Sequence, residues 1–441
     1  ITSSSLTDLE TLSTSIGNNE FSSGIGLTAI AVSDTTIDAT TLASTISTYD
    51  VINGAGTTSM TLASGATINI DAGEITQILA NETASRLSII DQNIVVTGNI
   101  SVDNANLLSA TTTGVVTASI TPTERVSELK TLTGTTNAYS IEISSEDAAA
   151  SASDLNAINA LTTVAVDLTN VTSITSSSLT DLETLSTSIG NNEFINDSGL
   201  TAIAVSDSTI DATTLASTIS TYDVINGAGT TSMTLASGAT INIDAGEITQ
   251  ILANETASRL SIIDQNIVVT GNISVDNANL LSATTTGVVT ASITPTERVS
   301  DLTRLTETTN AYSIEISSED AEVTAWYLNT IDAKTTAAID ASAVTSITGS
   351  YKDVTYIYDS SGVTNLGNEA IEITNSLSVT EANVIDGLTE GVVTASITPT
   401  ERVSDLTRLT GTTNAYSIEI SSEDAEVTAW YLNTIDAKTT A

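Results

Sequence analysis

The feature that most constrains this chain is a long block of sequence that occurs three times. It reads GVVTASITPTERVSELKTLTGTTNAYSIEISSED from Gly114 to Asp147, and it returns almost unchanged from Gly287 and from Gly391. Repetition at this length is typical of proteins built as arrays, in which each repeat packs only against its neighbours. Any property of the block is therefore present at least three times.

Longer repeats contain this block and divide the 441-residue chain. Residues 1–148 match residues 174–321 at a shift of 173, and residues 391–441 match residues 287–337 with a single difference. All of these repeats are expected to belong to one continuous solenoid. The predicted divisions are repeat unit 1 at 1–173, repeat unit 2 at 174–337 and a partial repeat unit 3 at 338–441.

The first two long repeats differ most in one short stretch. SSGI at 22–25 becomes INDS at 195–198, and variation of this kind is typical of a surface loop. The repeats are also cut within a motif at both Ile1 and Ala441. We expect these residues to be a window from a longer chain or its processed core, with a genuine mature terminus as the alternative.

Strand-like and helix-like stretches alternate inside each repeat. The strands have an apolar residue at every second position, and the helices have a narrow apolar stripe at every third or fourth position. The predicted helical stripes are Val126, Leu129 and Leu132; Leu155, Ile158 and Leu161; and Leu179, Leu182 and Leu185. The predicted strand positions are Tyr139, Ile141 and Ile143; Ile203 and Val205; Ile241 and Ile243; and Val164 and Val166.

Helix-initiation signals recur before the helix-like stretches. Thr121-Pro122-Thr123-Glu124 has the hydroxyl and the carboxylate of a capping box, with proline at the first helical position. A carboxylate at such a start also interacts favourably with the helix dipole. The other predicted helix starts are Ser144–Asp147, Ser178–Asp181, Ser208–Asp211, Asp244–Glu247, Ser350–Asp353 and Ser378–Glu381.

Together these patterns predict an α/β fold. Each long repeat holds about six strand–helix coils of roughly 29 residues, near the upper end for leucine-rich-repeat coils. A strand, a helix and a parallel strand joined by short connections form a right-handed crossover. The sequence therefore predicts a right-handed solenoid of strand–helix coils with one parallel sheet. An all-β solenoid is the alternative, because Thr, Ser, Ile and Val are abundant.

The charge balance and the missing residue types exclude several classes of function. Eleven Lys and Arg against 53 Asp and Glu give a net charge of −42, which argues against binding nucleic acid or an anionic membrane. The absence of Cys and His excludes Cys/His zinc sites, thiol nucleophiles and Ser-His-Asp triads. No run of about 20 apolar residues occurs, so membrane insertion is not expected. Calcium is the one cofactor that the acidity suggests, with plain solubility as the alternative explanation, and no metal ligands are assigned.

Acidic pairs and arginines are the candidate catalytic groups. Glu146-Asp147 and Glu319-Asp320 have the groups to hold a divalent ion or to act as acid and base, but helix capping explains them better. An arginine follows the Glu of the capping box in each block, where a local ion pair accounts for it. Because each group is copied with the array, we assign no catalytic residues and expect no enzyme. These arginines are Arg125, Arg298 and Arg402.

Two aromatic pairs are candidate ligand-binding groups. Trp326 with Tyr327, and Trp430 with Tyr431, have the rings of a sugar-stacking platform. Local packing is the preferred interpretation, because the residues that follow Tyr327 continue a helical apolar stripe.

Three segments resemble a known group of proteins: LNTIDAKTTAAIDASAVTSITGS from Leu328, SSGVTNLGNEAIEIT from Ser360 and ANVIDGLTEGVVTAS from Ala382. They resemble the repeats of giant secreted cell-surface proteins of marine cyanobacteria and related bacteria. The resemblance implies an exported, very long cell-surface or extracellular-matrix protein, and it carries over no catalytic residues. The nonapeptide GGxGxD of calcium-binding rolls is absent.

We therefore expect a secreted structural repeat protein that forms an extended acidic rod in a filament, sheath or surface layer. Its expected partners are further copies of itself, through the open ends of the sheet, and cell-surface polysaccharide. Two alternatives stay open. One is the stalk of an adhesin or phage-type fibre, and the other is a carbohydrate-active β-helix enzyme.

Overall fold

The protein is a mixed α/β structure with parallel sheets, as the sequence predicts. The computed structural model describes residues 1–21, 26–195 and 199–441, and within them it contains 16 α-helices, four 3-10 helices and 27 strands. These helices rule out the all-β alternative for the described residues. The loop predicted at 22–25, and its counterpart at 196–198, lie outside them.

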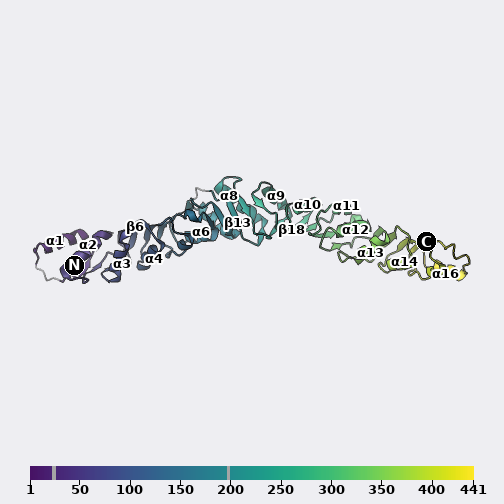
Figure 1. Ribbon diagram of the computed structural model, residues 1–441, viewed down its shortest axis with the longest axis horizontal. Coiled ribbons are helices and arrows are strands. Elements are labelled where there is room, and N and C mark those ends of the chain that lie inside the picture. Colours follow the sequence, from purple (N-terminus) through teal and green to yellow (C-terminus); the bar gives the residue numbers. More distant parts are fainter. Residues whose placement is uncertain (22–25, 196–198) are drawn as a thin grey trace. The chain divides into compact units, whose positions relative to one another are not determined.

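Contacts divide the chain into two compact units, and Figure 1 labels helices and strands of both. Unit 1 comprises 1–207 and 217–234, and unit 2 comprises 208–216 and 235–441. The predicted boundaries near residues 173 and 337 separate sequence repeats. That they also separate parts of the folded chain stays a prediction.

The helices of unit 1 are α1 (Leu6–Gly17), α2 (Ala39–Asn53), α3 (Ile75–Thr83), α4 (Val102–Thr111), α5 (Val126–Leu129), α6 (Ala152–Asn159) and α7 (Leu179–Gly190), with 3-10 helices η1 (Ala72–Glu74) and η2 (Ser145–Asp147). Its strands are β1 (Ala29–Ala31), β2 (Thr36–Asp38), β3 (Ser59–Thr61), β4 (Thr67–Asp71), β5 (Leu87–Ser88), β6 (Asn93–Ile100), β7 (Val116–Ile120), β8 (Ala138–Ser140), β9 (Ala149–Ser151), β10 (Val166–Asp167), β11 (Ser173–Ser177), β12 (Phe194–Ile195), β13 (Ala202–Val205) and β15 (Ser232–Thr234). Helix α8 (Ala212–Asn226) has residues in both units.

The helices of unit 2 are α9 (Ile248–Thr256), α10 (Val275–Thr284), α11 (Val299–Leu302), α12 (Ala325–Asp332), α13 (Tyr351–Asp359), α14 (Val379–Asp386), α15 (Val403–Leu406) and α16 (Ala429–Asp436), with η3 (Ala245–Glu247) and η4 (Ser318–Asp320). Its strands are β14 (Thr209–Asp211), β16 (Thr240–Asp244), β17 (Leu260–Ser261), β18 (Asn266–Ile273), β19 (Val289–Ile293), β20 (Ala311–Glu315), β21 (Glu322–Thr324), β22 (Ile339–Asp340), β23 (Ser346–Gly349), β24 (Val363–Thr364), β25 (Ala370–Ile373), β26 (Val393–Ser396) and β27 (Ala415–Ser417).

Within each sheet, neighbouring strands come from successive segments of the chain. In unit 1 the order β2-β4-β6-β7-β8 follows the sequence, and in unit 2 so does β21-β23-β25-β26-β27. Each of these pairs is parallel, and the partners come from successive segments, as in Ala395↔Tyr416 and Ile37↔Ile68. Apolar residues therefore stand beside apolar residues from strand to strand, which buries them in rows.

The prediction of one parallel sheet is wrong, because the described strands form several sheets. In unit 1, β1 and β2 follow each other closely but pair in different sheets, separated by residues 32–35. The strands have two to eight residues, and polar residues such as Ser33 and Asp34 break the extended backbone between them. Asp34 also accepts a hydrogen bond from the Leu6 N–H of α1, at 2.8 Å. The strands before and after this break therefore pair in different sheets.

Most predicted helix starts are confirmed. Ser178, Ser350 and Ser378 accept hydrogen bonds from the third residue of α7, α13 and α14, and Asp244 with Glu247 forms a capping box on η3. At Ser144 the cap begins only the 3-10 helix η2. The predicted stripes of α5, α6 and α7 are buried at all positions except Leu161.

Two predicted helix starts are wrong. Thr121–Glu124 forms a turn closed by the Glu124 N–H and the Thr121 carbonyl, at 3.0 Å, and α5 begins only at Val126. Pro122 thus occupies the second position of a turn, where its fixed φ is equally suitable. Residues 209–211 form β14 rather than a helix, and Asp211 itself accepts from the Thr214 N–H at 2.9 Å.

The interior consists mainly of Ile, Leu, Val and Ala, together with five fully buried tyrosines. A buried tyrosine needs a partner for its hydroxyl. In unit 1, Tyr49 donates to the Leu9 carbonyl and Tyr222 donates to the Leu182 carbonyl, each at 3.0 Å. The predicted strand position Val164 is exposed, whereas Val166 is buried. None of the described helices has the length and apolar character needed to cross a membrane.

The glycine that opens each repeated block marks a close approach between backbones. A Cβ at Gly287 would lie 2.2 Å from the Gln265 carbonyl oxygen, and Gly114 and Gly391 have equivalent contacts at 2.2 and 2.3 Å. Only glycine permits this separation without moving a backbone.

We expect Gly287→Ala to lower the free energy of unfolding by about 1–3 kcal/mol, because the new methyl group would separate two packed backbones. Gly190→Ala is the control, since a Cβ there meets nothing within 4 Å, and it should change stability by less than about 1 kcal/mol. Denaturant unfolding followed by circular dichroism measures both. Equal effects of the two substitutions would contradict this account of the block.

Candidate functional site

The structure brings each candidate arginine together with an acidic pair from the next segment of the chain. Arg298 pairs with Glu319 at 2.7 Å and with Asp320 at 3.0 Å. The two other copies repeat this arrangement, with Arg125 on Glu146 and Asp147 and with Arg402 on Glu423 and Asp424. The predicted local ion pair with the preceding Glu is wrong. Each arginine has an extended backbone immediately before its helix, so its side chain reaches a more distant segment.

The two carboxylates of each acidic pair have different environments. The Glu319 side chain is three-quarters exposed, whereas Asp320 is buried. The Asp320 carboxylate accepts a hydrogen bond from the Val299 N–H at 2.9 Å, and so caps α11. Asp147 caps Val126 at 2.7 Å and Asp424 caps Val403 at 2.8 Å in the same way. Capping therefore accounts for the Asp of each pair, although the capped helix belongs to the preceding segment, whereas the Glu pairs with the arginine.

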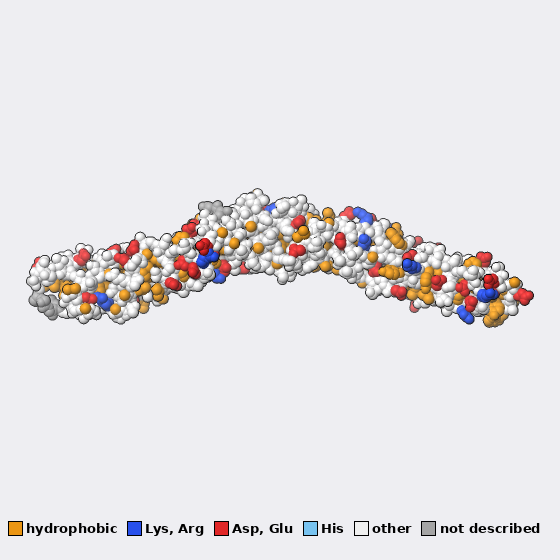
Figure 2. Space-filling model, viewed as in Figure 1, with side chains coloured by type: hydrophobic (Ala, Val, Ile, Leu, Met, Phe, Trp, Pro, Cys, Tyr) orange, Lys and Arg blue, Asp and Glu red, His pale blue; other side chains and the backbone are white. Residues whose placement is uncertain are grey.

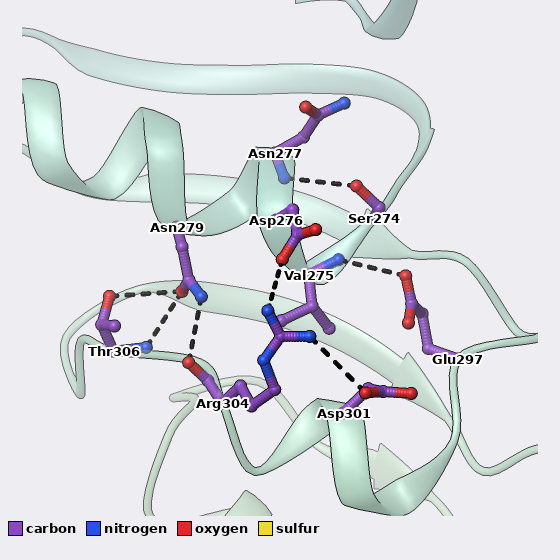
Figure 3. Close-up of polar contacts among 9 residues, drawn as sticks. All are labelled: Ser274, Val275, Asp276, Asn277, Asn279, Glu297, Asp301, Arg304 and Thr306. Atoms are coloured by element: carbon purple, nitrogen blue, oxygen red, sulfur yellow. Dashed lines mark hydrogen bonds and ion pairs between the residues drawn. The ribbon is translucent and has the colours of Figure 1, made fainter.

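A second carboxylate in each block makes the same kind of contact with the helix before it. Figure 3 shows Glu297 accepting from the N–H of Val275, the first residue of α10, at 3.2 Å. Glu124 and Glu401 do the same for Val102 and Val379, at 3.2 and 3.3 Å. A carboxylate at a helix N-terminus stabilises both the unpaired N–H groups and the helix dipole. Consecutive segments are thus joined by carboxylates at their helix starts.

Burial and hydrogen bonds shift the pKa values of these acids in opposite directions. Partial burial raises the pKa of Glu124, and its neighbour Glu128 adds to this effect. The pKa of Glu128 is lowered, first by the hydrogen bond it accepts from the Arg125 N–H.

Arg304 and Asn279 form a further set of contacts in the second block (Figure 3). Arg304 bridges Asp276 at 2.8 Å and Asp301 at 3.5 Å. Asn279 accepts from the Thr306 N–H at 3.0 Å and donates to the Arg304 carbonyl at 3.0 Å. Sequence reasoning missed this set. The sequence does carry a signal for these contacts, because an Asn occurs at the same distance before each repeated block, at positions 106, 279 and 383.

A buried asparagine, also missed, links the strands of each block. Asn310 accepts from the Val289 N–H at 2.8 Å and donates to the Tyr312 hydroxyl at 3.0 Å. Asn137 and Asn414 repeat both contacts. Burial raises the pKa of Tyr416, the partner of Asn414, to about 12. The signal in the sequence was the motif Asn-Ala-Tyr in all three copies.

The aromatic pairs lie on the surface. Trp326 is 57% exposed and its ring centroid lies 5.1 Å from that of Tyr327, in an edge-on arrangement. Trp430 and Tyr431 repeat this geometry at 5.0 Å. Leu328 is fully buried, so the apolar stripe is confirmed but does not include the tryptophan. Trp326 thus packs locally against Tyr327 and not into the core, and the choice between local packing and a sugar-stacking platform stays a prediction.

A shallow hollow of about 410 Å³ lies beside the first aromatic pair. Its lining includes Tyr327, Arg298, Asp320, Thr324 and Thr348. An aromatic ring at the edge of a polar hollow suits a hydroxylated ligand better than an apolar one.

Within the described residues, no group of three or more acidic side chains is placed to hold a metal ion. The suggestion of calcium thus stays a prediction without assigned ligands. No family model and no curated protein matches this chain.

We expect Asp320→Ala to lower the free energy of unfolding by about 1–3 kcal/mol, because it leaves the buried Val299 N–H without a partner. Glu319→Ala is the matched control. It removes an exposed ion pair to the same arginine and should cost less than about 1 kcal/mol. Denaturant unfolding of both variants tests this, and an equal or larger loss for Glu319→Ala would contradict the assignment of Asp320 as the cap.

Proposed function

We propose that this chain is a non-enzymatic structural protein, in which strand–helix segments stack as a right-handed solenoid. We propose further that it forms an acidic rod within an extracellular filament, sheath or surface layer. The parallel pairing of strands from successive segments, within each unit, supports a stacked arrangement. In Figure 1, successive helices of unit 2 also follow one another in chain order.

One observation carries the proposal. The groups that most resemble catalytic machinery, Arg298 with Glu319 and Asp320, occur in three equivalent copies and join one segment to the next. A catalytic pair requires carboxylates free to reach a substrate. Here the buried Asp is held by a backbone N–H and by a guanidinium, so its contacts serve the fold.

The surface charge supports an extracellular setting. Carboxylates far outnumber basic groups in the sequence, 53 to 11, and Figure 2 shows acidic side chains along the drawn face of both units. A large net charge keeps a repeat protein soluble and discourages contact between rods except at their ends. The resemblance to giant secreted surface repeats agrees with this setting.

The direct test is small-angle X-ray scattering of the 441-residue chain, followed by electron microscopy. A stacked solenoid gives a pair-distance distribution with a long tail and a thin particle of uniform width. Two compact globules give two maxima and would overturn the solenoid. Immunogold labelling of the source cells then tests location, and label confined to the cell interior would overturn the extracellular role.

A second candidate function is adhesion to polysaccharide, and the exposure of Trp326, whose ring partner Tyr327 lines the hollow, favours it. An exposed indole ring offers a flat apolar face on which a sugar ring can stack. With this function the protein would have the same structural scaffold and would also bind a polysaccharide ligand. Sugars would stack on the rings of Trp326 and Tyr327, with hydroxyl groups toward the Thr residues that line the hollow, Thr324 and Thr348.

We expect Trp326→Ala combined with Trp430→Ala to weaken retention on a neutral polysaccharide column by on the order of tenfold. Leu280→Ala, which removes an exposed apolar side chain elsewhere in unit 2, is the control and should not change retention. Unchanged retention of the double variant would contradict adhesion through these rings. Release of soluble sugar by the unmodified chain would instead favour the enzyme alternative.

A further inference from the structure

The segment that follows the repeated block differs between the first two repeats at its exposed positions. Residues 322–327 read EVTAWY, whereas the equivalent residues 149–154 read AASASD. Both segments form a short strand and a capped helix, as β21 with α12 and as β9 with α6. The fold of the segment therefore does not require Glu322, Trp326 or Tyr327, whose counterparts in the first repeat are Ala, Ser and Asp.

These three residues belong to one surface in unit 2. Glu322, Thr324 and Tyr327 line the hollow of about 410 Å³, together with Thr348, which is the parallel strand partner of Thr324. Strand β21 buries only its middle residue, so Glu322 and Thr324 are exposed. The exposed ring of Trp326 lies edge-on to that of Tyr327. We call these five residues the aromatic site.

The aromatic site carries negative charge that the chain does not offset. Arg298 lines the same hollow, but its guanidinium is already paired with two carboxylates of the following segment. Glu322 is exposed and has no ion-pair partner among the described residues. A second exposed acid, Glu372, is the strand partner of Thr348. Aromatic faces beside unpaired carboxylates attract a cation.

The first repeat shows a cation at the corresponding position. Lys130 pairs there with Asp154, the counterpart of Tyr327. In the second repeat Thr303 stands at the position of the lysine, so this internal ammonium group is lost. The neighbouring Arg304 is bound to two other carboxylates. The first repeat thus supplies its own ammonium group at this position, and the second repeat has threonine there.

We propose that the aromatic site binds a polysaccharide that carries free amino groups. A sugar ring stacks on Trp326 and Tyr327, and a protonated amino group of the ligand pairs with Glu322. The inference rests on the second candidate function, adhesion to polysaccharide, and adds the charge of the ligand.

The threonines favour a sugar over a basic peptide as the source of the amino group. The Thr324 hydroxyl accepts a hydrogen bond from the Tyr327 N–H at 3.4 Å, and it keeps its own proton for donation. Sugar hydroxyl groups both donate and accept hydrogen bonds, whereas a lysine ammonium group only donates. A polysaccharide with amino groups therefore suits the hydroxyls, the rings and the carboxylate together.

Isothermal titration calorimetry of the full chain tests the charge of the ligand. The probes are a β-1,4-linked glucosamine hexamer and its fully N-acetylated form, which have the same length and linkage and differ in charge. The chain carries Trp430→Ala, which removes the second aromatic pair. Titrations are made at about pH 5.5, where amino groups are protonated and most Glu side chains are ionised, and in about 0.15 M salt to screen distant charges.

We expect the glucosamine hexamer to bind about tenfold more tightly than the N-acetylated hexamer. Adding Glu322→Gln should weaken binding of the glucosamine hexamer by about fivefold and change binding of the N-acetylated hexamer by less than about twofold. Glu315→Gln is the matched control, because Glu315 is also exposed but lies in a different sheet. It should leave both affinities unchanged.

Each contrary result has a distinct meaning. Equal affinity for the two hexamers would overturn the requirement for amino groups and leave adhesion to polysaccharide standing. Binding of neither hexamer would overturn both proposals. An equal loss in the Glu315→Gln control would assign the preference to overall charge and overturn the site. Hexalysine that binds as tightly as the glucosamine hexamer, with the same dependence on Glu322, would assign the site to a basic peptide and overturn the proposal.

A second variant returns the ammonium group of the first repeat to the second. Thr303→Lys should weaken binding of the glucosamine hexamer by about fivefold, because an internal cation then competes for the site. Thr184→Lys, at an exposed position in unit 1, adds the same charge elsewhere and should have less than about a twofold effect. Circular dichroism confirms that both variants are folded. Equal affinities of the two lysine variants for the glucosamine hexamer would overturn the proposal.

Discussion

The structure depends on carboxylates that reach from one segment to the helix start of the segment before. Short helices leave their first N–H groups without partners inside the helix. Glu297 meets the N–H of Val275 and Asp320 meets that of Val299, each from the following segment of the chain. Since each carboxylate binds a backbone group that every residue except proline carries, the contact can be repeated without special partner residues. Contacts between successive segments thus satisfy these helix ends while apolar rows fill the interior.

This arrangement also accounts for the composition. An acid at each junction explains many of the 53 carboxylates without assigning them to a ligand. The arginines of the repeated block lie where two carboxylates converge, as Arg298 does between Glu319 and Asp320. The arginines and carboxylates of the repeated block therefore hold segments together. The remaining candidate for contact with a ligand is the exposed aromatic surface around Trp326.

Some segments with nearly the same sequence occur in different surroundings. They distinguish the effect of local sequence on side-chain burial from the effect of neighbouring segments. Leu328 is fully buried where α12 packs against α13, while the same local sequence leaves Leu432 46% exposed. In an array of this kind, burial is a property of the junction between segments rather than of the segment.

By itself the sequence determined the repeats, the alternation of strands and helices, the α/β class and most helix starts. These features depend on the spacing of apolar residues and on capping groups close to each helix start. Both are visible in the sequence itself. It did not show that the strands form several sheets, that Pro122 lies in a turn, or that Arg298 reaches Glu319 and Asp320. Only the tertiary structure decided these points, because they depend on where each segment bends and on which distant segment is its neighbour. The exposure of Trp326 was decided in the same way, since the position of a side chain on a helix does not reveal what covers it.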